Sequence, residues 1–106
     1  MRQKISSQHF NDPAGNPAGG HTQGVGIAIE WQNGPLGRGD GRAEPNGAFV
    51  EGVIAAALDR IHYYQDSKFK CRENALAITK LEEALHWLDH RTQEREHRQV
   101  EGTHGV

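Results

Sequence analysis

The chain has 106 residues, 35% of them hydrophobic, and carries 12 Lys and Arg against 14 Asp and Glu, a formal net charge of -2 at pH 7. A chain of this length forms one domain with a small core, and assembly with further copies is a common way to stabilise such a domain. The charge balance argues against a protein that binds long polyanions such as duplex DNA, and no stretch approaches the roughly 18 apolar residues of a membrane span.

The first 23 residues are polar and rich in Gly, Pro, Asn and His. We expect residues 1–23 to be an arm that is irregular or becomes ordered only against a partner. The run Val25–Gln32 alternates between apolar and polar residues, which predicts a strand with Val25, Ile27, Ile29 and Trp31 on one face. This strand needs a pairing partner from the arm, from the following loop or from another subunit.

A glycine-rich loop follows over Asn33–Arg42. One interpretation is a flexible turn connection. The other is a loop whose exposed amides, together with Arg38 or Arg42, close over an anion.

Residues 46–66 have the apolar spacing of a helix, and Asn46 is placed to cap its first turn. The predicted apolar stripe comprises Val50, Val53, Ile54, Ala57, Leu58, Ile61 and Tyr64. Tyr63 falls on the opposite side, where we expect it to be exposed or at an interface.

A second helix is expected over residues 70–99, and its stripe comprises Asn74, Ala77, Ile78, Leu81, Ala84, Leu85, Leu88 and Thr92. Cys71 is the single cysteine, so an internal disulfide is excluded, and a half-buried residue at the helix start is favoured over a nucleophile. The second helix would be about 38 Å long against about 27 Å for the first. It therefore extends past its partner, and a neighbouring subunit would cover the stretch Arg91–Arg98, which makes a homo-oligomer our hypothesis.

The arginines of that stretch suggest anion binding. Arg91, Arg95 and Arg98 are spaced i, i+4, i+7 and share one side of the helix, beside the apolar stripe. Guanidinium groups bind phosphates bidentately, so a phosphate-bearing ligand is one interpretation. The alternative is a solvated charged end whose arginines pair with Glu94, Glu96 and Glu101.

Two further side chains have open roles. Tyr64 is either a ring on which a base stacks or part of the core. Asn74 either reads a base edge or ties the linker between the helices.

A metal site is the rival hypothesis. Glu83 with His86, and Glu94 with His97, repeat the i, i+3 carboxylate–imidazole spacing of carboxylate-bridged metal bundles. Both pairs lie opposite the apolar stripe and too far apart to share one centre, so a solvated face is favoured. No catalytic arrangement, phosphate-binding loop or dinucleotide fingerprint is present, and we expect neither enzymatic activity nor a cofactor.

A family resemblance adds to this interpretation. The segment Arg72–Leu88, its continuation Arg91-Thr92-Gln93 and the ending Val100-Glu101-Gly102-Thr103-His104 resemble the helical hairpin shared by phage Thoeris anti-defence proteins and anti-CBASS sponges. The upstream motifs are similar to the Thoeris anti-defence branch, which adds a β element before the hairpin; these motifs are Trp31-Gln32-Asn33-Gly34-Pro35, Asn46-Gly47 and Tyr64-Gln65. The family usually has Arg-Gly before Val-Glu-Gly-Thr, whereas this chain has Arg98-Gln99.

The resemblance implies a sponge that binds immune signal nucleotides and leaves them intact in the cytoplasm of the infected bacterium. The implied ligands are cyclic ADP-ribose isomers such as glycocyclic ADP-ribose, with cyclic di- and trinucleotides at a separate site in some members. Tyr64 would stack on a base, Asn74 would contact a base or ribose, and Arg91 would clamp a phosphate. Arg72 and Arg95 are candidates for a second, symmetry-generated pocket, and Thr92 and Arg38 complete the set of ligand-binding candidates.

The expected fold is therefore α+β, with an N-terminal β element followed by an antiparallel two-helix hairpin, assembled as a dimer or a trimer of dimers. The sponge domain would cover 24–106, with the strand and loop in 24–45, the helices in 46–66 and 70–99, and a tail in 100–106. Two other functions stay open: a metal-binding helical bundle, and a phage structural or interaction module with the arginines as a charged rim.

Overall fold

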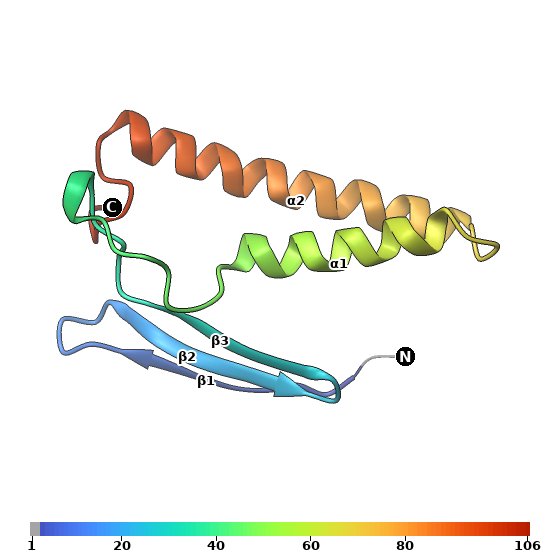
Figure 1. Ribbon diagram of the computed structural model, residues 1–106, viewed down its shortest axis with the longest axis horizontal. Helices are drawn as coiled ribbons and strands as arrows, with labels where there is room; N and C mark the ends of the chain where they lie inside the picture. Colours follow the sequence, from blue (N-terminus) through green and yellow to red (C-terminus); the bar gives the residue numbers. More distant parts are fainter. Residues whose placement is uncertain (1–2) are drawn as a thin grey trace. The chain divides into compact units, whose positions relative to one another are not determined.

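The computed structural model describes residues 3–106, and it has the expected α+β organisation of strands followed by a helical hairpin (Figure 1). The chain divides into two compact units. One contains the chain up to Phe49 together with Gln99–Val106, and the other is Val50–Arg98.

The first unit contains a three-stranded antiparallel sheet. Its strands are β1 (Ser6–Asn11), β2 (Pro17–Gly24) and β3 (Ile27–Asn33), and they lie side by side in chain order (Figure 1). Because side chains alternate along a strand, β3 places Ile27, Ile29 and Trp31 on one face, as predicted. Val25 is in the turn before β3 and is 83% exposed.

The expectation of an irregular N-terminal arm is wrong for the described residues of 1–23, because they form β1 and β2. Main-chain pairing orders this polar segment, with β1 paired to β2 and β2 paired to β3. Side-chain hydrogen bonds across the strands support the pairing: Ser7 Oγ lies 2.8 Å from Thr22 Oγ1, which accepts a 2.9 Å hydrogen bond from Trp31 Nε1. At the turn between β1 and β2, the Asp12 carboxylate accepts from the Asn16 amide, and this bond is the main reason why the pKa of Asp12 is lowered.

The glycine content of residues 1–23 led us to predict an irregular arm, but the sheet requires a glycine at one of these positions. Gly20 has φ +143°, and a Cβ there would lie 2.3 Å from the Gln8 carbonyl oxygen of the adjacent strand. The register of β1 shifts nearby, between His9 and Asn11. Close backbone approach at an irregularity in a strand is a role that glycine alone fulfils without strain.

Residues 46–48 extend the sheet instead of starting a helix. The Asn46 side chain accepts from the Asn33 amide at 2.8 Å and donates to the Asn33 carbonyl at 2.9 Å. Ala48 then exchanges main-chain hydrogen bonds with Glu30 and Gln32. The prediction of Asn46 as the helix N-cap is therefore wrong: its amide group pairs with a strand, and the helix begins later.

The second unit is the helical hairpin of α1 (Val50–Gln65) and α2 (Arg72–His97), both shorter than the ranges expected from the sequence. Every residue of the predicted α2 stripe is half-buried, and so are the α1 residues Val53, Ile54, Leu58 and Ile61. Val50 and Ala57 were also predicted for the α1 stripe, but they are exposed. Cys71 is the N-cap of α2, with its Sγ accepting from the Asn74 amide, and it is exposed rather than half-buried.

The hairpin has no fully buried side chain, and no hydrophobic residue within 3–106 is buried. At 1.5 Å per residue, α1 is about 24 Å long and α2 about 39 Å, so α2 extends past its partner as expected. Neither described helix is long and apolar enough to cross a membrane.

Candidate functional site

The linker between the helices is tied by side-chain amides. Gln65 donates to the Cys71 carbonyl and accepts from the Cys71 amide, both at 3.0 Å. Asn74 Nδ2 donates to the Phe69 carbonyl at 3.3 Å. Asn74 therefore ties the linker, while no described residue donates to its Oδ1, which is left as an acceptor.

Beside this linker, two tyrosines and an arginine form a stacked group at the end of α1. The rings of Tyr63 and Tyr64 lie 5.7 Å apart and are tilted by 37°. The Arg60 guanidinium lies over both, 4.7 Å from the Tyr63 centroid and 4.8 Å from the Tyr64 centroid. A hydrogen bond with Tyr64 is the main reason why the pKa of Arg60 is raised.

Both tyrosines are exposed: Tyr63 is 55% exposed and Tyr64 is 42% exposed. Tyr64 is therefore not a buried core residue within one chain. Arg60 was not among the predicted site residues. The signal was present, because a cation three and four positions before two aromatic residues shares a helix surface with both.

Among the remaining α2 candidates, Arg72 is the first residue of the helix and lies at the linker end, and the others lie near the other end. Arg91 is exposed, whereas Arg95 is half-buried on the side of the apolar stripe. The Thr92 hydroxyl donates to the Leu88 carbonyl at 3.2 Å, which is a bond within the helix.

The linker end and the arginine end are far apart within one chain. At 1.5 Å per residue, Asn74 and Arg91 are separated by about 26 Å along α2, and Arg72 and Arg91 by about 28 Å. One small nucleotide cannot contact Tyr64 and Arg91 of the same chain. A site that uses both must therefore combine two copies placed in opposite directions.

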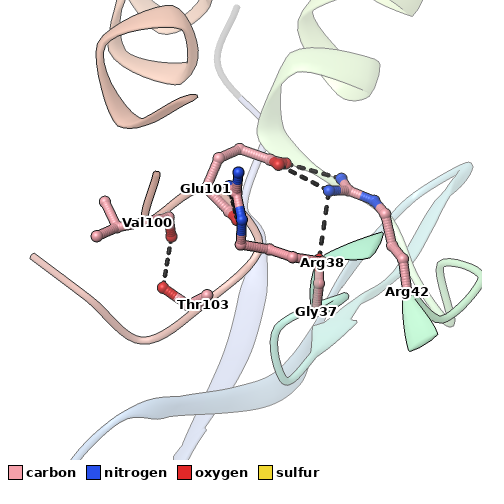
Figure 2. A network of polar contacts seen from close by, with 6 residues as sticks. All are labelled: Gly37, Arg38, Arg42, Val100, Glu101 and Thr103. Carbon is pink, nitrogen blue, oxygen red and sulfur yellow. Dashed lines mark hydrogen bonds and ion pairs between the residues drawn. The ribbon is translucent and has the colours of Figure 1, made fainter. Parts of the chain in front are cut away.

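Arg38 belongs to a third group, in the unit that contains the sheet (Figure 2). Its Nη1 donates to the Glu101 carbonyl at 3.0 Å, and Arg42 pairs with the Glu101 carboxylate. The Gly37 amide also donates to the Gly102 carbonyl at 2.7 Å. We call this group the clasp: Gly37, Arg38 and Arg42 on the loop, and Glu101 and Gly102 on the tail.

The clasp fastens the glycine-rich loop to the C-terminal tail, which is not the arrangement of a flexible connection. The other interpretation, closure of this loop over an anion, stays a prediction. Glu101 pairs with Arg42 of this loop, a partner that the charged-end interpretation did not include.

Across residues 3–106, no three His, Cys, Asp or Glu side chains are grouped so that they could hold a metal ion within one chain. Glu83 forms an exposed ion pair with Lys80, in which Oε2 of Glu83 lies 3.6 Å from Nζ of Lys80.

Comparison with known proteins gives two findings. Residues 23–93 match the model of the Acb2/Tad1 hairpin domain, a range that includes β3, α1 and most of α2. The chain is also similar to Thoeris anti-defense 1 of Bacillus phage SBSphiJ7, with 63% identity over 59 residues. That match covers 56% of this chain and 42% of the relative, so the matching segment spans less than half of the relative's own length.

Proposed function

This chain belongs to the Acb2/Tad1 hairpin-domain family, and we propose that it is a phage anti-Thoeris protein that sequesters cyclic nucleotide immune signals without cleaving them. The observation that carries the proposal is the matched hairpin. Residues 23–93 contain Tyr64 and Asn74 at the linker end, and they also contain Arg91. The favoured ligands are cyclic ADP-ribose isomers, with cyclic di- and trinucleotides as further candidates. The site of action is the cytoplasm of the infected bacterium.

In the proposed complex, each site takes its linker end from one copy and its arginine end from another. The exposed Tyr64 ring of one copy stacks on the base, and Asn74 Oδ1 accepts from a base or ribose donor. Arg91 of the second copy pairs with a phosphate, where partial removal from water strengthens the bond. Arg72 and Arg95 contribute to a second pocket generated by the same symmetry.

The uncovered apolar surface of the hairpin supports assembly into a homo-oligomer. Its stripe residues are only half-buried in one chain, and association would remove that area from water at about 25 cal/mol per Å². A two-fold axis would also place the linker end of one copy beside the arginine end of its partner. Analytical ultracentrifugation tests this step: a protomer that stays single at micromolar concentration contradicts it.

Sequestration needs binding alone. The effector responds only to free signal, so a sponge blocks it when it is abundant and its Kd lies below the activating concentration. The residues proposed for the site bind and orient the nucleotide, and none is assigned a role in proton or group transfer.

Isothermal titration calorimetry with cyclic ADP-ribose isomers tests the proposal, followed by heating the complex and analysing the released nucleotide. We expect saturable binding and recovery of the nucleotide unchanged. Released nucleotide in a cleaved form would indicate an enzyme. Absence of binding combined with melting that responds to a chelator would favour the metal-binding alternative, and neither response would favour an interaction module.

A further inference from the structure

Arg60 already covers one face of Tyr64, the ring on which a base would stack in the proposed complex. The Arg60 guanidinium carbon lies 4.8 Å from the Tyr64 ring centroid, within the range of a cation–π contact. A base that takes the same face must displace this group. The other α1 ring, Tyr63, shares the same cation at 4.7 Å.

Arg60 is held by these rings and by its hydrogen bond with Tyr64, and not by an acid. Within residues 3–106, no carboxylate forms an ion pair with Arg60, and its side chain is exposed. Exposed cation–π contacts are weak and are easily exchanged for a stronger partner. A phosphate is such a partner, because an arginine can bind it through two parallel charge-assisted hydrogen bonds.

We infer that Arg60 is a further ligand-binding residue: its guanidinium covers Tyr64 in the free protein and turns onto a phosphate of the nucleotide when the base takes its place on the ring. This inference rests on the proposed function, and it adds a phosphate contact at the linker end to the one assigned to Arg91.

The exchange makes the site selective for ligands that carry both a base and a phosphate. A nucleoside without phosphate must displace Arg60 and offers it nothing in return. A phosphate without a base leaves Tyr64 covered. Only a nucleotide replaces the lost cation–π contact with a stronger ion pair.

The test measures two probes, a cyclic ADP-ribose isomer and adenosine, by calorimetry at several salt concentrations. The variants are Arg60→Ala and Arg60→Lys, and Lys80→Ala is the control because it removes one exposed cation from the same helical unit. In Arg60→Ala we expect cyclic ADP-ribose affinity to fall about tenfold to a hundredfold and to depend less on salt. Adenosine affinity should stay equal or rise, because the Tyr64 face is free. Arg60→Lys should keep part of the salt dependence.

Nuclear magnetic resonance gives a readout that a purely structural role would not move. The Arg60 Nε–Hε signal should lie upfield in the free protein, owing to the two rings, and move downfield on saturation with cyclic ADP-ribose. The inference is overturned, and the proposed function stands, under two joint conditions. The Arg60 signal of the wild type does not move when the nucleotide binds, and Arg60→Ala has the affinity and the salt dependence of the wild type. Equal weakening of both probes would also overturn it, by indicating a structural role. Failure of the wild type to bind overturns the proposed function together with the inference.

Discussion

The guanidinium of Arg42 meets the carboxylate of Glu101 through two parallel hydrogen bonds, Nη1 to Oε2 and Nη2 to Oε1, each 2.7 Å long (Figure 2). The two residues are far apart in the sequence, so this pair fixes the start of the C-terminal tail on the glycine-rich loop. The side chains are 39% and 20% exposed, respectively. Solvent therefore screens the pair in part, and its bidentate geometry places it near the upper end of exposed ion pairs.

A double-mutant cycle measures this pair directly. We expect Arg42→Ala and Glu101→Ala to share a coupling free energy of about 1 kcal/mol in urea unfolding, with a smaller value at high salt. The Lys80–Glu83 pair, exposed and 3.6 Å long, is the control and should give a coupling close to zero. A coupling at Arg42 and Glu101 no larger than the control would contradict the role of the clasp.

Gly102 is the clasp residue with the least tolerance for a side chain. It has φ +78°, and a Cβ there would lie 2.3 Å from the Gly37 carbonyl oxygen. Gly102→Ala should lower the free energy of unfolding by about 2–4 kcal/mol, because it combines left-handed strain with a collision. Gly39→Ala is the matched control: it has φ +66° and open space around its Cβ, so we expect a loss of about 1 kcal/mol. Equal losses in the two variants would rule out the collision.

Gln99 follows the C-cap of α2 and has φ +61°, a conformation that favours glycine at this position. Gln99→Gly should therefore raise the free energy of unfolding by about 1 kcal/mol. The same change inside α2, Gln93→Gly, should lower it by about 1 kcal/mol, since glycine is unfavourable within a helix. Destabilisation by Gln99→Gly in thermal melts would show that the left-handed backbone is not strained.

Arg91→Ala should remove most of the affinity for cyclic ADP-ribose isomers while the melting temperature stays within about 1 °C of the wild type. Arg91 is exposed and lies beyond the stretch of α2 that α1 covers, so its loss leaves the hairpin packing intact. Lys80→Ala is again the control and should bind normally. A large fall in melting temperature with unchanged affinity would support the charged-rim alternative.

Periodicity was enough to predict the hairpin, because each helix presents an apolar side to the other. The α2 stripe from Asn74 to Thr92 is half-buried in full. Periodicity was not enough for the N-terminal strands, whose polar side chains carry no alternating pattern. Their order comes from main-chain pairing and from contacts such as Trp31 Nε1 to Thr22 Oγ1, which no local rule anticipates.

The candidate site shows the same division. Once the helices were predicted, their residue numbers alone placed Tyr64 and Asn74 at the linker end and Arg91 near the other end of α2. The wide separation of Asn74 and Arg91 then follows from helix geometry. The attachment of Arg38 to Glu101 could not be predicted, because it depends on how the tail folds back. Asn46 was assigned to the wrong partner, since a side-chain amide pairs equally well with a helix start or a strand edge.

The central claim is that one nucleotide site combines Tyr64 of one copy with Arg91 of another, and mixing two inactive variants tests it most directly. Tyr64→Ala and Arg91→Ala are each expected to lose binding of a cyclic ADP-ribose isomer. After the two are unfolded together and refolded, random pairing should restore about one site in four, measured as calorimetric stoichiometry. A mixture of wild type with the double variant should restore nothing beyond the wild-type pairs. If the mixed single variants bind no more nucleotide than either alone while the wild type binds, a site shared between copies is contradicted.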